Sequence, residues 1–78
     1  MLDYDLLRNQ LDELASAIEK LPNMASEVER LRSARDAAQV RDETSLRKHL
    51  RAVGAWVIDV ATKIGVTVAA EAIKNAIK

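Results

Sequence analysis

The sequence predicts a small all-α protein, a bundle of three to four helices with coiled-coil-like packing. Apolar side chains recur at spacings of three and four residues, which is the period of one face of a helix. Phenylalanine is absent, and the 78 residues include one proline and two glycines. With 49% apolar and 31% charged residues, the chain is too apolar to be disordered. A core of this size is marginal unless the helices pack very well or another chain covers apolar surface.

The first apolar stripe predicts a helix that breaks at Pro22. Its members are spaced by four, three, four and three residues, which is also the a/d pattern of a coiled-coil seam. They are Leu7, Leu11, Leu14, Ile18 and Leu21. Proline disfavours helical geometry in the residue before it, so the helix ends near Leu21. The next helix then begins with Asn23 as its cap or with Pro22 as its first residue.

A second helix is predicted from Met24 to about Arg41, with a weaker apolar face. That face consists of Met24, Val28, Leu31, Ala34 and Ala38. The two helices are similar in length and are separated by a short break. We therefore expect an antiparallel helical hairpin over residues 1–41, with a kinked continuous helix as the alternative.

The third apolar stripe predicts one long helix that extends to Ile64. Its cap comes from the segment "RDETS", which offers Asp42, Thr44 or Ser45. The stripe consists of Leu46, Leu50, Val53, Val57, Val60, Ala61 and Ile64. Trp56 lies on its flank.

The stretch "ATKIGVTVAAEAIKNAIK", residues 61–78, predicts a helix break at Gly65. If the third helix continued through this glycine, its polar side would swing by roughly 140°. Glycine in a helix costs about 0.8–1 kcal/mol relative to alanine, and β-branched residues follow it. We expect a short last helix capped by Thr67. The alternative is a continuous helix whose two halves bury opposite faces.

The charges of the chain are unevenly distributed although the net charge is zero. Residues 1–45 carry ten acidic and six basic side chains, a net charge of −4, and residues 46–78 carry two acidic and six basic ones, a net charge of +4. We therefore expect a single helical domain over residues 1–78, in which an acidic hairpin (1–41) attracts a basic apolar segment (42–78). This attraction can act within one fold or between copies.

The residues that usually perform chemistry are sparse. His49 is the single histidine and the chain has no cysteine, so a zinc site would lack a second nitrogen or thiolate ligand. No serine lies in a nucleophile-elbow pattern, and Gly54 and Gly65 stand alone rather than in a phosphate-binding loop. We expect no enzymatic activity, no metal and no cofactor.

The N-terminal "MLDYDLLRNQ" is unlike a secretory signal, because it has acidic residues where lysine or arginine would stand. Charged residues interrupt the apolar C-terminal half, whereas a spanning helix needs roughly 20 mostly apolar residues. We expect a cytoplasmic protein without a transmembrane helix.

The apolar residues after Leu46 predict helix-mediated association. The stripes before and after Gly65 are out of register, so one flat surface cannot cover both, and another copy or a partner helical protein would cover the second. Trp56 is either a core residue or an interface anchor. The candidate interaction residues are Val53, Trp56, Val57, Val60, Ile64, Val66, Ala69, Ala70, Ile73 and Ile77. The predicted function is a non-enzymatic association module that self-assembles through residues 46–78.

Two other functions remain open. The last helix could lie on a membrane surface, with Lys74 and Lys78 near the lipid headgroups. A basic cluster from Arg41 to Arg51 could bind the phosphates of a nucleic acid, although no aromatic side chains are interleaved with it for base stacking. The zero net charge also disfavours this function.

The stretch "LRAVGAWVIDVATKIGVTVAAEAIKNAI" resembles the helical C-terminal segments of bacterial proteins, some of them from conflict and anti-phage systems. The similarity covers about residues 46–77 and rests mainly on small and aliphatic residues. It implies a bacterial accessory or oligomerisation domain that is attached to, or partnered with, an effector.

Overall fold

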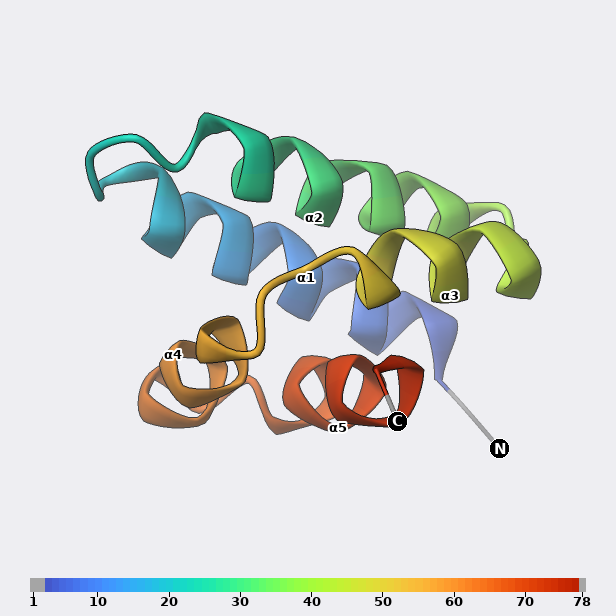
Figure 1. The fold of residues 1–78 in the computed structure, drawn as a ribbon. Helices are drawn as coiled ribbons and strands as arrows, with labels where there is room; N and C mark the ends of the chain where they lie inside the picture. The colour runs from blue at the N-terminus through green and yellow to red at the C-terminus, as the bar shows by residue number, and fades with distance from the viewer. Residues whose placement is uncertain (1–2, 78) are drawn as a thin grey trace.

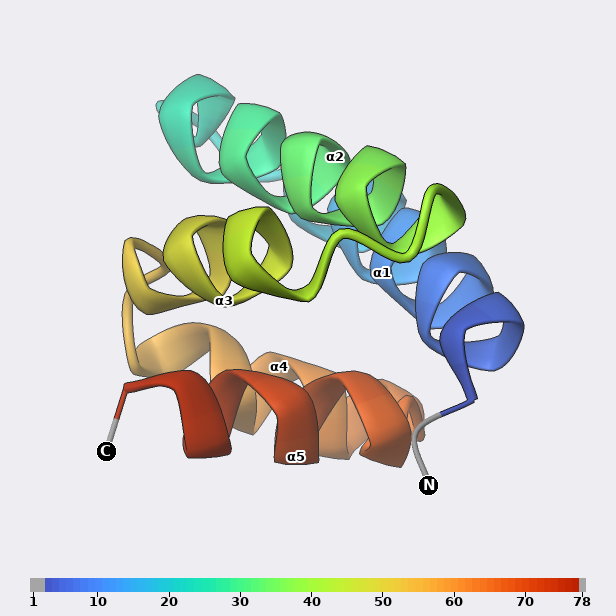
Figure 2. The ribbon, with the colours of Figure 1, turned by 90° about the vertical axis from the view of Figure 1, so that its right-hand side faces the viewer.

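The computed structural model describes residues 3–77, which form five α-helices and no strand (Figure 1). The all-α class is confirmed, while the number of helices exceeds the three to four expected. The helices are α1 (Tyr4–Glu19), α2 (Ala25–Gln39), α3 (Glu43–Arg51), α4 (Trp56–Ile64) and α5 (Thr67–Ala76). Figure 2 shows them in layers, with α2 on one side, α4 and α5 on the other, and α1 and α3 between. None of the helices within residues 3–77 has the length and apolar character needed to cross a membrane.

Helix α1 carries the centre of the core, as its stripe predicts. Asp3 caps the helix by accepting a hydrogen bond from the backbone N–H of Leu6 (3.0 Å). Four members of the stripe are fully buried: Leu7, Leu11, Leu14 and Ile18. The fifth, Leu21, lies beyond the end of the helix and is 45% exposed. Helix α1 packs against α2, α4 and α5.

Helices α1 and α2 form the predicted antiparallel hairpin (Figure 1). Three ion pairs run along it: Glu19–Arg32 (2.6 Å), Asp12–Arg35 (2.7 Å) and Asp5–Arg41 (4.0 Å). Such exposed pairs contribute about 0–1 kcal/mol each. Among residues 3–77, no ion pair joins the acidic hairpin to the segment from residue 42 onward. Within residues 3–77, the expected attraction between the acidic and the basic segment is therefore not made by direct ion pairs.

The prediction of one long helix up to Ile64 is wrong. Helix α3 ends at Arg51 and α4 begins at Trp56, and the turn between them buries Val53. The break coincides with a contact from another helix: the Oε2 atom of Glu27 in α2 accepts a hydrogen bond from the backbone N–H of Gly54 (2.9 Å). A glycine is weakly helical and its N–H is free to bond elsewhere, so a tertiary partner can end the helix here.

The helix break at Gly65 is confirmed. Gly65 has a φ of +86°, the left-handed conformation that glycine adopts without a steric penalty. The N–H of Val66 donates to the carbonyl of Ala61 (2.9 Å) and that of Gly65 to the carbonyl of Thr62 (3.2 Å). This is the hydrogen-bond pattern of a Schellman motif. It turns the chain so that Val66, which is 2% exposed, enters the core.

The caps of the other helices follow the predictions in part. Asp42, one of three candidates, caps α3 by accepting hydrogen bonds from the N–H and the hydroxyl of Ser45 (3.1 and 2.8 Å). These bonds stabilise the carboxylate and lower the pKa of Asp42. Met24 precedes α2 without a side-chain cap, so Asn23, which has a φ of +62°, does not cap that helix. Pro22 lies in the turn before it and is not its first residue. Arg41 follows α2 with a φ of +55°.

Helix α5 is capped from a distance rather than by Thr67, which is its first residue. The Oε1 atom of Gln10 in α1 accepts a hydrogen bond from the backbone N–H of Ala69 (3.0 Å), 59 positions away in the sequence. The first N–H groups of a helix have no partner within it, so this contact satisfies one of them. It also fixes α5 against α1.

We expect Gln10→Ala to destabilise the fold by about 1–2 kcal/mol, because the N–H of Ala69 loses its acceptor in a partly buried position. Gln10→Glu is the matched control, since it keeps an acceptor oxygen and adds a negative charge at a helix N-terminus. Urea unfolding followed by circular dichroism measures both. Equal stability of the alanine variant and the natural protein would show that the contact contributes nothing.

Candidate functional site

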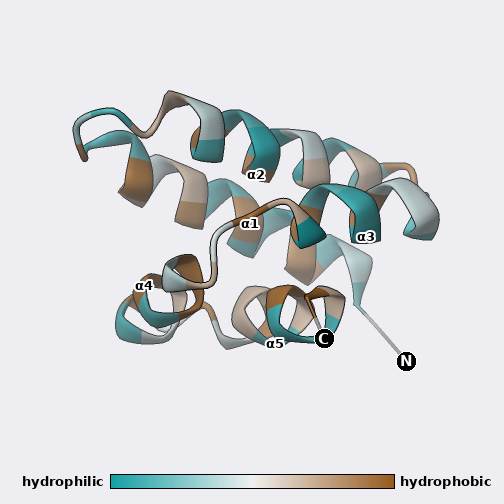
Figure 3. Ribbon diagram, in the orientation of Figure 1, coloured by the Kyte–Doolittle hydropathy of each residue, from teal (hydrophilic) through white to brown (hydrophobic). Residues whose placement is uncertain are grey.

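The exposed face of α4 carries large apolar side chains. Trp56 is 39% and Ile64 is 42% exposed, and Val60 is half-buried between them. Residues spaced by four lie on one side of a helix, so the three form a continuous stripe, here called the α4 stripe. Val57 and Ala61 on the adjacent side are fully buried in the core. Helix α4 is also the most apolar of the five helices (Figure 3).

The indole of Trp56 is positioned by the turn that precedes α4. A Cβ atom at position 54 would lie 2.7 Å from the Nε1 atom of Trp56, so the ring rests directly on the backbone of Gly54. Glu27 holds this backbone from α2 and also pairs with Arg30 (2.6 Å). The ring therefore rests on a turn that Glu27 holds from α2, while one part of the ring remains exposed. The sequence gives no signal for the role of Glu27, since 27 residues separate it from Gly54.

Two opposite charges follow one edge of the α4 stripe. Asp59 and Lys63 are exposed and lie one helical turn apart. On an ideal helix, they sit about 60° and 20° from Trp56, on the side away from the core. Neither forms an ion pair with any other residue in the described range 3–77. The stripe thus has a polar edge with one negative and one positive end.

The ten candidate interaction residues separate into a buried and an open group. Six lie in the chain's own core: Val53, Val57, Val66, Ala69, Ala70 and Ile73. Val60 and Ile77 are half-buried, and Trp56 and Ile64 are exposed. Helices α1, α3 and α4 all contact α5 and cover the face that we expected a partner to cover. Of these ten residues, the two that are exposed, Trp56 and Ile64, both belong to the α4 stripe.

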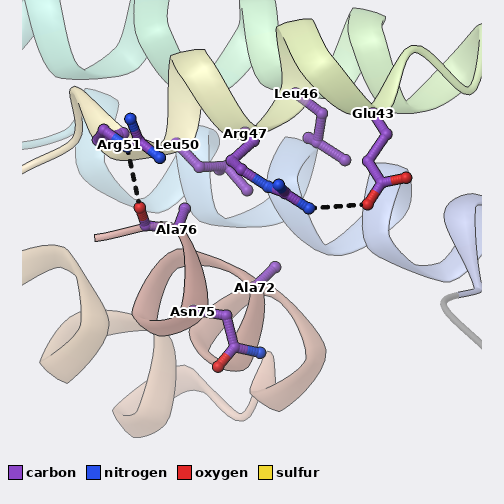
Figure 4. Close-up of a pocket in the computed structure, with 8 residues that line it drawn as sticks. All are labelled: Glu43, Leu46, Arg47, Leu50, Arg51, Ala72, Asn75 and Ala76. Carbon is purple, nitrogen blue, oxygen red and sulfur yellow. Dashed lines mark hydrogen bonds and ion pairs between the residues drawn. The ribbon is translucent and has the colours of Figure 1, made fainter. Parts of the chain in front are cut away.

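A second surface feature is a groove of about 390 Å³ between α3 and α5 (Figure 4). Its lining residues are Glu43, Leu46, Arg47, Leu50, Arg51, Ala72, Asn75 and Ala76. The two arginines already have partners in the chain: Arg47 donates to Glu43 (2.9 Å) and Arg51 to the carbonyl of Ala76 (3.2 Å). Arg51 thereby satisfies a carbonyl at the C-terminal end of α5.

The basic cluster from Arg41 to Arg51 does not form one free patch. The guanidinium of Arg41 lies 6.0 Å from the ring centroid of Tyr4 and 4.0 Å from Asp5. Arg47 and Arg51 are bonded as described above, and His49 is half-buried. Within residues 3–77, no group of three or more histidine, aspartate or glutamate side chains could hold a metal ion.

The structure is that of a small all-α protein in which the α4 stripe is partly exposed to solvent. No known family model matches the chain, and neither the curated proteins nor the solved structures yield a match. These comparisons do not test the resemblance of residues 46–77 to bacterial accessory segments, which stays a prediction. The interpretation of function therefore rests on the α4 stripe itself.

Proposed function

We propose that the protein is a non-enzymatic association module that self-assembles through the α4 stripe. The observation that carries the proposal is the partly exposed Trp56, fixed over Gly54 beside the exposed Ile64. Tryptophan is enriched among the residues that dominate binding energy, and a side chain that is already ordered loses little entropy on binding. We extend the proposal to a cytoplasmic accessory or oligomerisation domain of a bacterial effector system, which is what the sequence resemblance implies.

The proposed assembly is weak and depends on concentration. Helix α4 has nine residues, which corresponds to a length of about 14 Å. A contact between elements of this length falls below the roughly 1,200 Å² of total buried area that is typical of stable complexes. We therefore expect monomers in dilute solution and larger species as the concentration rises.

We expect Ile64→Asp to abolish self-association while the fold persists, because Ile64 is exposed and its substitution places a charge in the stripe. Leu6→Asp is the matched control: Leu6 is 41% exposed but lies on α1. Light scattering over a range of concentrations measures the mass, and circular dichroism confirms the fold. A natural protein that stays monomeric throughout, or an equal loss of mass in the control, would contradict the proposal.

The membrane-surface alternative has no specific observation in its favour. It needs the apolar side of α5 to face lipid, but Ala69 and Ile73 on that side are fully buried. The exposed positions of α5 include Thr67, Glu71 and Lys74. The other lysine of that alternative, Lys78, lies outside the described residues.

A further inference from the structure

We propose that α4 pairs with α4 of a second copy in antiparallel orientation, about a two-fold axis at the level of Ala61. In this arrangement Asp59 of each copy meets Lys63 of the other. The inference rests on the proposed function, since it specifies how the α4 stripe meets its partner. It makes the assembly a closed dimer, because each copy uses the same patch.

The α4 stripe is suited to such pairing because it extends to both sides of the axis. Trp56 and Ile64 lie at its two ends and Val60 lies between them. With a rise of about 1.5 Å per residue, antiparallel pairing places Trp56 of one copy within about 3 Å, along the axis, of Ile64 of the other. The two copies of Val60 are offset by about 3 Å, so that their side chains can interdigitate. The large indole thus meets a branched aliphatic side chain at each end.

The charged edge of the stripe decides between the possible orientations. An antiparallel two-fold places the charged edges of both copies on the same side of the interface, running in opposite directions. Asp59 of one copy then stands level with Lys63 of the other, and the reciprocal pair forms as well. Neither side chain has an ion-pair partner within residues 3–77, so both are free to pair between copies.

The parallel two-fold arrangement lacks this complementarity. It places the two charged edges on opposite sides of the interface, so that no Asp59 reaches a Lys63 of the other copy. The ion pairs of the antiparallel dimer remain at its rim, so they set orientation more than affinity.

Disulfide cross-linking tests the orientation, because the chain has no cysteine of its own. The two variants are Asp59→Cys and Lys63→Cys, oxidised singly and as an equimolar mixture. A disulfide requires Cα atoms within about 7 Å of each other. In the antiparallel dimer positions 59 and 63 are level, whereas two copies of either position are offset by about 6 Å along the axis. The mixed dimer also keeps one Asp59–Lys63 pair.

We expect the mixture to form the cross-linked heterodimer several-fold faster than either variant forms a homodimer, as seen on non-reducing gels with one variant carrying a size tag. Homodimers of Lys63→Cys that form as fast as the heterodimer would overturn the inference. Equal slow rates in all three samples would overturn it as well. If the natural protein still self-associates and Ile64→Asp abolishes this, only the orientation fails. A natural protein that stays monomeric contradicts the proposed function too.

Discussion

Ile73→Asp is expected to unfold the protein rather than to release a partner. Ile73 is fully buried, and α5 packs against α1, α3 and α4. Truncating a buried isoleucine to alanine alone costs about 2–5 kcal/mol, and an unpaired buried carboxylate costs more. Small domains are stable by only about 5–15 kcal/mol, so the variant should be largely unfolded at neutral pH.

Thermal melting followed by circular dichroism measures this effect. Ile64→Asp is the matched control, because it introduces the same side chain on the neighbouring helix at a position that is 42% exposed. Its stability should lie within about 0.5 kcal/mol of the natural protein, as for most surface substitutions. If Ile73→Asp stayed folded and lowered only the mass of an assembly, α5 would be a partner-binding element instead of a core element.

A chain that ends after Gly65 is expected to lose cooperative folding. This truncation removes Val66, Ala69 and Ile73 from the core. It also exposes the faces of α1, α3 and α4 that α5 covers. It also leaves Gln10 without the N–H that it caps. Urea unfolding should show a broad transition in place of a sharp one, because less surface is buried in the folded state.

The sharpness of the transition separates two views of α5. A shortened chain that unfolds as cooperatively as the full one would show that residues 3–65 fold without α5. It would then restore the sequence-based expectation that the C-terminal segment is a separate association element. The full-length chain with Gln10→Ala is the milder comparison, since it removes one contact of α5 and keeps its core residues.

Several features that are local in the sequence were predicted correctly, although the caps expected from Asn23 and Thr67 were not. The stripe from Leu7 to Ile18 is buried as its spacing indicates, and Asp42 caps α3. The break at Gly65 follows from a shift in the apolar pattern together with a residue that tolerates positive φ. Each of these depends on residues within a few helical turns.

The features that depend on distant partners could not be predicted. The stripe from Leu46 to Ile64 keeps its register through Gly54, so the sequence shows one helix there. At the break, Gly54 donates to Glu27, and at the start of α5, Ala69 donates to Gln10. Neither pairing leaves a pattern in the sequence. Arg41 adopts positive φ, which side chains other than glycine, asparagine and aspartate rarely do.

The burial of the expected interaction residues could be predicted from the sequence only in part. Trp56, Val60 and Ile64 were among the expected interaction residues and remain at least partly accessible. The helical wheel could not show that α1 and α3 cover α5, because it describes one helix at a time. Burial by other helices is what separates the open α4 stripe from the rest of the apolar residues after Leu46.

The central claim is that the α4 stripe is the surface through which copies of the chain associate. Trp56 is the single tryptophan, so its fluorescence reports on this surface directly. The most direct measurement follows mass by light scattering and Trp56 emission in the same concentration series. We predict that the mass rises from 8.6 kDa towards twice that value, and that the emission shifts to shorter wavelengths along the same curve. A mass that rises while the emission stays constant, or a mass that stays at 8.6 kDa throughout, would contradict the claim.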